Sequence, residues 1–153
     1  MDTTDRKILN LLQTDASLTV KQIADQIALS VTPCWKRIQK LEAQGFIRAR
    51  VALLDPDKVN ASVTVFVAIK TDQHTAEWIE RFSRSVSDMP EVMEIYRMSG
   101  EIDYLLRVVV SSLEAYDRFY KRLVERIDLS NVTSSFAMEQ MKYTNALPIN
   151  IDD

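Results

Sequence analysis

Residues 18–42 contain two short helical patterns separated by a turn, and this arrangement constrains the fold more than any other part of the sequence. The first pattern repeats apolar residues at helical spacing, namely Ile23, Ala24 and Ile27. Leu29 closes the turn, and Ser30 or Thr32 can cap a second helix that has Pro33 in its first turn. We therefore expect a helix-turn-helix over these residues.

The second helix of this pair carries a row of cations. Its pattern turns Ile38 and Leu41 inward and directs three basic side chains outward, namely Lys36, Arg37 and Lys40. A helix of this kind can lie in the major groove of DNA, where the residues at its start meet base edges and flanking cations meet phosphates. The alternative is a small helical hairpin whose basic face contacts only water.

The charge of the chain is distributed unevenly between its two parts. The net charge is −3 over 153 residues, a length that suits one ordinary domain or two small ones. Residues 1–50 carry +3 and the remainder carries −6. This asymmetry is typical of a basic binding module attached to an acidic body.

Cys34 is the single cysteine, so no disulfide can form within the chain. We expect a cytoplasmic protein, because no signal segment or stretch long enough to cross a membrane is evident. The position of Cys34 near a helix N-terminus favours a thiolate and hence a redox switch. The alternative for this residue is a buried, inert thiol.

Helical patterns also flank the helix-turn-helix. A first helix is expected over 5–14, capped by Thr3 or Thr4, and the third helix ends at Gly45. Residues 46–54 have strand character, which predicts a winged arrangement or a strand linker. The Asp-Pro turn that follows places the boundary of the first domain between residues 50 and 60.

The rest of the chain alternates strand and helix patterns. The expected strands are 62–69, 92–98, 104–110 and 132–138, and the expected helices are 75–86 and 112–127. This β-α-β-β-α-β order predicts a ferredoxin-like domain and an α+β fold class. The predicted organisation is a helix-turn-helix domain at 1–50, a linker at 51–61 and a ferredoxin-like domain at 62–153.

A four-stranded sheet with both helices on one face leaves its other face bare. Apolar alternation assigns five residues to that bare face: Val63, Val65, Val67, Leu106 and Val108. A partner subunit is expected to cover such a face, which predicts a homodimer.

The sequence resembles the Lrp/AsnC family of bacterial transcriptional regulators over nearly its whole length. The resemblance depends on several motifs in order: 5–9, 32–38, Leu41-Glu42, Gly45-Phe46-Ile47, Leu54-Asp55-Pro56, Pro90-Glu91-Val92, Gly100 with Asp103-Tyr104, and Ser134-Ser135-Phe136. Residues 103–108 and 146–148 are similar to the feast/famine regulators that sense amino acids, and the context of Trp35 is similar to a cysteine-responsive branch. The sequence departs from the family pattern at Asn60, where a glycine is usual.

The resemblance implies double-stranded DNA as a partner and a set of DNA-binding residues. They are Ser30, Thr32, Pro33, Trp35, Lys36, Arg37 and Lys40, with Arg48 and Arg50 near the DNA backbone. Trp35 either contacts the nucleic acid or packs under the turn. The family also implies dimers that assemble further, to tetramers or octamers, with small amino acids bound between them.

An amino acid effector is a zwitterion, so its pocket needs an acceptor for the ammonium and donors for the carboxylate. Asp103 can accept from the ammonium, and backbone N–H groups near Gly100 can bind the carboxylate. The predicted effector residues are Met98, Ser99, Gly100, Glu101, Asp103, Tyr104, Ser134, Ser135 and Phe136. The alternative is a tight turn in which Asp103 only bonds nearby backbone.

Two other classes of function fit the residues less well. An enzyme is not expected, because His74 is the only histidine and only Gly45 and Gly100 could contribute to a phosphate-binding loop. No cofactor and no metal site are expected, since Cys and His lack ligand spacing. A protein adaptor that uses its helical unit to bind another protein is the second alternative; it would not bind duplex DNA.

Overall fold

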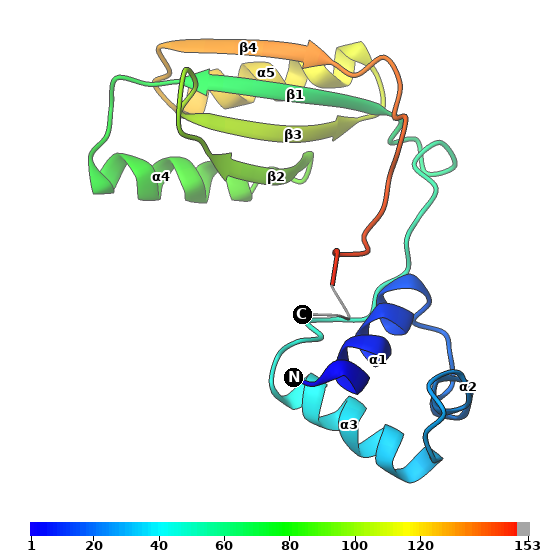
Figure 1. Ribbon diagram of the computed structural model, residues 1–153. Coiled ribbons are helices and arrows are strands. Elements are labelled where there is room, and N and C mark those ends of the chain that lie inside the picture. Colours follow the sequence, from blue (N-terminus) through cyan, green and yellow to red (C-terminus); the bar gives the residue numbers. More distant parts are fainter. Residues whose placement is uncertain (150–153) are drawn as a thin grey trace. The chain divides into compact units, whose positions relative to one another are not determined.

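We describe a computed structural model of the protein over residues 1–149 (Figure 1). The chain forms two compact units. Of the described residues, the first comprises Met1–Leu53 together with 141–149, and the second comprises Leu54–Gln140. The sequence predicts a single domain over residues 62–153, whereas the structure groups residues 141–149 with the first unit.

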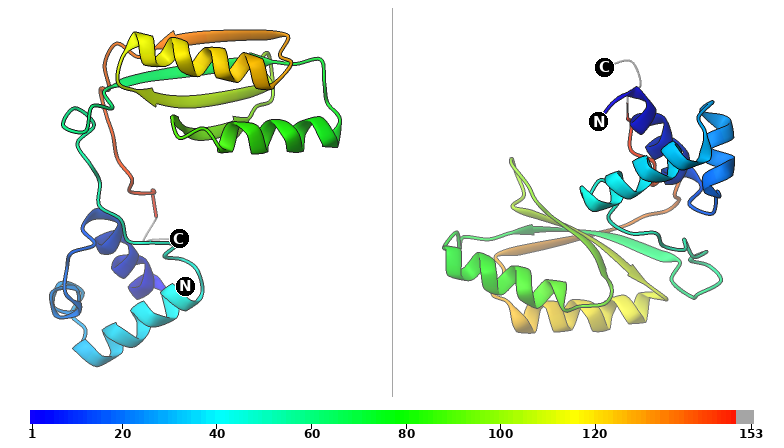
Figure 2. Two further views of the ribbon diagram at one scale, coloured as in Figure 1. Left: turned by 180° about the vertical axis from the view of Figure 1, so that it is seen from behind. Right: turned by 90° about the horizontal axis from the view of Figure 1, so that it is seen from below.

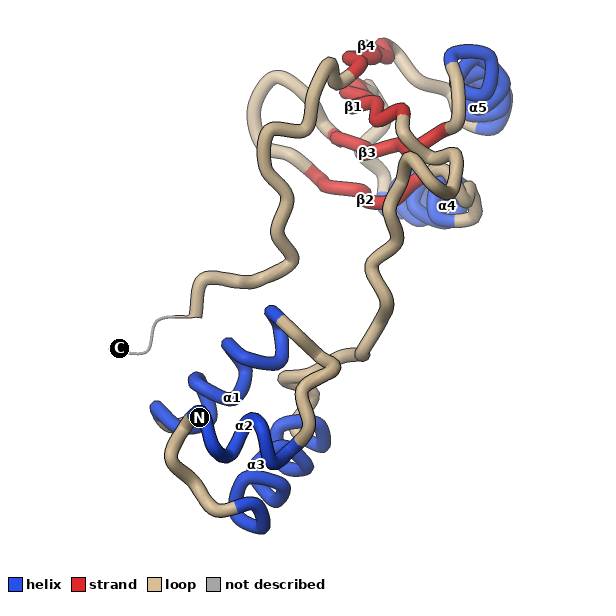
Figure 3. Tube along the Cα trace, turned by 90° about the vertical axis from the view of Figure 1, so that its right-hand side faces the viewer, coloured by secondary structure: helices blue, strands red, loops and turns tan. Residues whose placement is uncertain are grey.

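The first unit consists of three helices, α1 (Thr3–Thr14), α2 (Val20–Gln26) and α3 (Val31–Ala43), as Figure 3 shows. Asp2, rather than Thr3 or Thr4, is the N-cap of α1, and it forms a capping box with Asp5. Thr19 and Gln22 form a second capping box at α2. Because each box satisfies two backbone N–H groups, both short helices begin at defined residues.

The apolar faces of these helices form one small core. It contains Ile8, Leu9, Leu12, Ile23, Ala24, Cys34, Ile38 and Leu41. Ala28 adopts a positive φ of 53° in the turn between α2 and α3, and Ser30 takes the N-cap position of α3. The predicted helix-turn-helix is thus confirmed.

Residues 46–54, which were expected to have strand character, form no strand within the described part of this single chain. An isolated extended segment has no partner for its backbone hydrogen bonds, and this explains the difference. The following turn ends at Asn60, whose φ of 57° lies in the left-handed region. Asparagine tolerates this region better than most residues, so it can replace the glycine that is usual in the family.

The second unit has the predicted β-α-β-β-α-β order. Its elements are β1 (Val63–Lys70), α4 (Ala76–Ser87), β2 (Val92–Arg97), β3 (Tyr104–Val110), α5 (Leu113–Arg126) and β4 (Asn131–Phe136). The strands form one antiparallel sheet in the order β2-β3-β1-β4. Both helices cover the same face of the sheet (Figure 2).

The structure corrects which strand residues face the helices. Val65, Val67, Leu106 and Val108 are fully buried in the core under α4 and α5, so they are not on the bare face. Val63 packs against the same core. The open face instead carries the alternate residues, among them Phe66, Ala68, Leu105 and Val109. The open-face alternation also contains Thr64, Lys70 and Arg107, whereas the other alternation is entirely apolar. The prediction was therefore wrong because it assigned the fully apolar set to the bare face rather than to the face under the helices.

Among the described residues, no helix combines the length and apolar character that crossing a bilayer requires.

Candidate DNA-binding surface and effector site

The outer side of α3 carries the residues predicted to bind DNA. Ile38 and Leu41 fix α3 to the core, and the opposite side of the helix is exposed. The exposed residues of the predicted set are Ser30, Thr32, Pro33, Trp35, Lys36 and Lys40. Trp35 is 50% exposed, so the alternative in which it packs under the turn is wrong.

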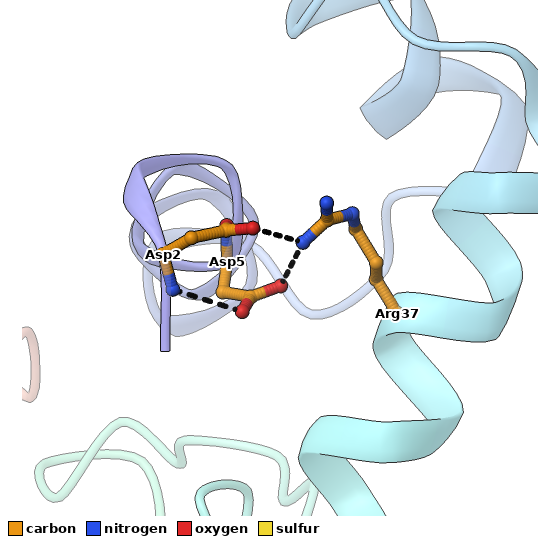
Figure 4. Close-up of polar contacts among 3 residues, drawn as sticks. All are labelled: Asp2, Asp5 and Arg37. Atoms are coloured by element: carbon orange, nitrogen blue, oxygen red, sulfur yellow. Dashed lines mark hydrogen bonds and ion pairs between the residues drawn. The ribbon is translucent and has the colours of Figure 1, made fainter.

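Arg37 lies on the side of α3 that faces α1 (Figure 4). Its Nη1 donates to Asp2 Oδ2 at 2.7 Å and to Asp5 Oδ1 at 2.8 Å. The side chain of Asp5 is only 11% exposed. These two contacts raise the pKa of Arg37. The pKa of Asp2 is lowered first by the Asp5 backbone N–H and then by its contact with Arg37. Arg37 therefore connects the start of α1 to α3.

A shallow surface hollow of about 550 Å³ lies at this junction. It is lined by Met1, Asp2, Asp5, Pro33, Lys36, Arg37 and Lys40. Lys36 and Lys40 thus stand beside an ion-paired arginine and two carboxylates. The cations that α3 offers to a phosphate most directly are the two lysines.

The remaining predicted cations follow α3. Arg48 is exposed, and the Arg50 guanidinium donates to Glu42 Oε1 at 2.8 Å. Exposed pairs of this kind contribute little to stability, so Arg50 can exchange its carboxylate for a phosphate at small cost.

Cys34 is fully buried in the core of the first unit. Burial raises the pKa of its thiol, because a low-polarity environment disfavours the thiolate. Of the two alternatives for this residue, the structure supports the buried, inert thiol.

In the second unit, Asp103 organises the connection between β2 and β3. Its Oδ2 accepts the Thr71 N–H at 2.8 Å, and its backbone N–H donates to Ile69 O at 2.9 Å. Its carbonyl oxygen accepts the Met98 N–H at 2.8 Å. The Asp103 carboxylate thus already accepts a backbone hydrogen bond. The donor, Thr71, lies in the segment after β1 and not in the turn that contains Asp103.

The tip of this connection is open to solvent. Met98, Ser99, Gly100 and Glu101 are all exposed, and Gly100 has a φ of +121°, a conformation that side chains disfavour. Tyr104 is different because it is 5% exposed and its ring lies 4.5 Å from the Phe82 ring. Tyr104 therefore belongs to the core and not to the surface of the loop.

The predicted effector residues on β4 divide between the two faces of the sheet. The Ser134 hydroxyl hydrogen-bonds to the Tyr116 hydroxyl, and the Phe136 ring packs edge-on against Tyr116 at 5.0 Å. Ser135 pairs with Phe66 in the register of β1 and β4 and lies on the open face.

The two groups of effector candidates lie at opposite edges of the sheet. The loop 98–103 joins edge strand β2 to β3, whereas Ser134–Phe136 belong to the other edge strand, β4. Within one chain, the structure does not bring the two groups together. A single pocket that uses both groups needs a second copy of the chain.

Sequence reasoning missed the ion pairs at Arg37 and the hydrogen bond between Tyr116 and Ser134. Asp2 and Asp5 have the spacing of a capping box, which indicates that their carboxylates lie together at the start of α1. This spacing was a usable signal for the ion pairs at Arg37. No comparable local pattern indicates the hydrogen bond between Tyr116 and Ser134.

Among the described residues, no cluster of three or more His, Cys, Asp or Glu side chains could hold a metal ion.

The fold and the two surfaces define a class of protein. A helix-turn-helix with an exposed cationic helix is joined to a separate α+β domain with an open sheet face, which is the organisation of a DNA-binding regulator with a sensing or assembly domain. Comparison with known proteins agrees. Residues 1–48 match the model of the winged helix-turn-helix DNA-binding domain, and residues 64–147 match the Lrp/AsnC ligand binding domain.

The chain is similar to several characterised or solved proteins over nearly its full length. It is 53% identical to the DNA-binding transcriptional activator DecR of Escherichia coli (strain K12), covering 97% of this chain and 99% of that protein. The crystal structure of an AsnC family transcriptional regulator from Agrobacterium tumefaciens is 60% identical, with a TM-score of 0.94 and 97% of each chain covered. A transcriptional regulator of Neisseria meningitidis in complex with L-Met is 34% identical, with a TM-score of 0.93. The match covers 98% of this chain and 97% of that chain. The protein therefore belongs to the Lrp/AsnC family of DNA-binding transcriptional regulators.

Proposed function

We propose that this regulator binds operator DNA through α3 and that a small amino acid changes this binding, in the control of amino acid metabolism. The observation that carries the DNA-binding part is the exposed row of Trp35, Lys36 and Lys40 on a helix whose opposite side is buried. The DNA-facing set is Ser30, Thr32, Pro33, Trp35, Lys36, Arg37, Lys40, Arg48 and Arg50. Arg37 contributes mainly by fixing α3 to α1.

The open face of the sheet supports a homodimer. Phe66 is 40% exposed there and lies between Arg107 and Ser135 on the neighbouring strands, while Ala68, Leu105 and Val109 occupy the next positions of the same face. A second copy that covers this face would present two α3 helices to two half-sites of a near-palindromic operator. We propose that such dimers assemble further, to tetramers or octamers, in the cytoplasm.

The effector site is proposed to use both edges of the sheet, from different copies of the chain. One copy supplies Met98, Ser99, Gly100, Glu101 and Asp103, and another supplies Ser134, Ser135 and Phe136. The L-Met complex of the Neisseria relative supports an amino acid ligand. Cysteine is a second candidate, from the context of Trp35. The protein acts as a regulator rather than an enzyme, and we propose no cofactor and no metal.

The DNA-binding part is tested by selecting targets from fragmented genomic DNA with the full-length protein. We expect enrichment of fragments that share a near-palindromic sequence, with binding that weakens steeply as salt rises. Fragments recovered without a shared sequence would contradict operator recognition. A protein adaptor would retain no DNA at all.

The effector part is tested by calorimetry with the twenty amino acids, including methionine and cysteine. We expect binding of one or a few of them, and loss of that binding in Asp103→Ala. Because Asp103 also holds the Thr71 N–H, Ser135→Ala serves as a second variant that leaves the loop intact. Heat from none of the twenty would contradict amino acid sensing.

A further inference from the structure

The last described residues of the chain pack on α1 of the DNA-binding unit. The matched ligand-binding domain extends to residue 147, yet the structure places residues 141–149 in the first compact unit. The segment 145–149, near the red end of the ribbon in Figure 1, thus lies against a helix more than 130 positions earlier in the sequence.

The central contact is a pair of hydrogen bonds between Gln13 and Leu147. Gln13 Nε2 donates to the Leu147 carbonyl oxygen at 2.8 Å, and the Leu147 N–H donates to Gln13 Oε1 at 2.8 Å. The side-chain amide thus satisfies both backbone groups of one residue, as a neighbouring strand would. The Ile149 N–H also donates to the Leu147 carbonyl oxygen at 2.9 Å, so the docked chain turns at Pro148. The contacts of Gln13 thus select main-chain groups and not a particular side chain.

Flanking contacts extend this arrangement. Asn10 Nδ2 donates to Ile149 O at 3.4 Å, and Asn145 Nδ2 donates to Gln13 O at 3.3 Å. Gln13 Nε2 also donates to Asn10 Oδ1 at 2.9 Å, which aligns the two amides three positions apart on one face of α1. The Ile149 side chain packs against the small core of the first unit.

We infer that this amide face of α1 is a docking surface for the main chain of a peptide segment, that its occupant is residues 145–149 of the same chain, and that docking gives the DNA-binding unit a second, shorter tether. The first connection between the two units begins after Ile47, which packs on the core of the first unit, and its residues 48–62 can extend to roughly 50 Å. Residues 137–144 join β4 to the docked segment and can extend to roughly 28 Å. Whenever the segment is docked, the shorter connection limits how far the DNA-binding unit can move from β4.

The first test measures amide hydrogen exchange at Leu147 in the full-length protein. In Gln13→Ala we expect exchange about tenfold faster or more, because the acceptor of this N–H is lost. Gln26→Ala is the matched control, since Gln26 is exposed on α2 of the same unit. Equal exchange in the wild type and Gln13→Ala would overturn the proposal.

The second test is a double-variant cycle, which remains informative even if Gln13→Ala destabilises the unit. Gln13→Ala should lower the Tm of the full-length chain by a few degrees. It should have a clearly smaller effect in a chain that ends at Thr144, because the partner of Gln13 is then absent. An equal loss in both backgrounds would show that Gln13 acts independently of the segment and would overturn docking.

A mixing experiment separates the chain's own segment from that of a second copy. Gln13→Ala chains are mixed with chains that end at Thr144, so that the only intact pairing joins two different copies. We expect Leu147 exchange to remain fast in the mixture. Restored protection would show that the segment docks on another copy and would overturn the assignment to the same chain.

Discussion

The two units of this protein stabilise themselves by different means. In the described part of the second unit, buried apolar residues from one sheet and two helices form a continuous core with aromatic contacts, such as Phe82 with Tyr104 at 4.5 Å. The core of the first unit is smaller and contains no aromatic side chain among its described residues. It is supplemented by polar connections, namely Arg37 with Asp2 and Asp5, and Gln13 with Leu147.

This difference has a physical reason. One side of α3 is exposed, so this helix buries only its other side, and a three-helix unit has little interior to fill. Charged and amide contacts at the periphery then connect helices that the core alone fixes weakly. We expect substitutions in the core to reduce the stability of the second unit strongly and substitutions on its surface to have little effect. We expect the stability of the first unit to depend also on single polar contacts.

The largest expected effect is on the core of the second unit. Phe119→Ala removes a fully buried ring, so we expect a loss of about 3–5 kcal/mol in the free energy of unfolding of this unit. Trp78 fluorescence during urea unfolding reports on it, because Trp78 is buried in the same core. Phe46→Ala, at a side chain that is 49% exposed, is the control and should cost little. Equal destabilisation of the first unit by Phe119→Ala would contradict separate cores.

A smaller effect is expected on DNA affinity from the exposed lysines. Replacing both Lys36 and Lys40 by alanine should weaken operator binding by about ten- to a hundredfold and reduce the salt slope by nearly two, because each phosphate contact releases counterions. Fluorescence anisotropy at several salt concentrations measures both quantities. Lys121→Ala on α5 is the control. If Lys121→Ala weakens binding as much as the double variant, α3 is not the DNA-contacting helix.

Arg37 distinguishes a structural role from a DNA contact. Arg37→Ala leaves the mostly buried Asp5 carboxylate without its cation, so we expect a loss of about 1–2 kcal/mol in the stability of the first unit. The Tm of that unit measures the loss. Asp2→Asn keeps a capping oxygen but weakens the hold on the guanidinium, and it should leave DNA affinity unchanged or raise it. Reduced DNA affinity in Arg37→Ala with an unchanged Tm would show that contact with DNA is its main role.

The smallest expected effect is the response of the two units to acid. The Asp5 N–H and the Arg37 guanidinium lower the pKa of Asp2 below 3.8, and the Arg107 guanidinium lowers the pKa of Glu94 below 4.5. Each carboxylate therefore stabilises its unit above its unfolded pKa, and this contribution is lost as the pH falls through the folded pKa. A Tm series from pH 6 to pH 2.5 should show both losses. Asp2→Asn and Glu94→Gln should each remove one; an unaltered pH dependence in either variant would refute its assignment.

Much of the fold could be predicted from the sequence because it depends on local periodicity. The helix-turn-helix follows from apolar spacing around Ile23 and Ile38, and the strand and helix order of the second unit follows from alternating patterns with capping residues such as Ser112. The candidate site was predicted less completely than the fold. The exposure of Trp35 could be assigned only once the orientation of α3 on the core was known, and the burial of Tyr104 only once the packing of α4 on the sheet was known.

The sequence by itself therefore determined which segments become helices and strands, which helix carries the cations, and the family to which the chain is similar, since all of these are encoded over a few neighbouring residues. Only the tertiary structure decided that Tyr104 packs against Phe82, that Arg37 joins Asp2 and Asp5, and that residues 145–149 dock on Gln13. These depend on contacts between positions distant in the chain. No local pattern specifies such contacts, because a side chain's partner is set by how whole elements pack.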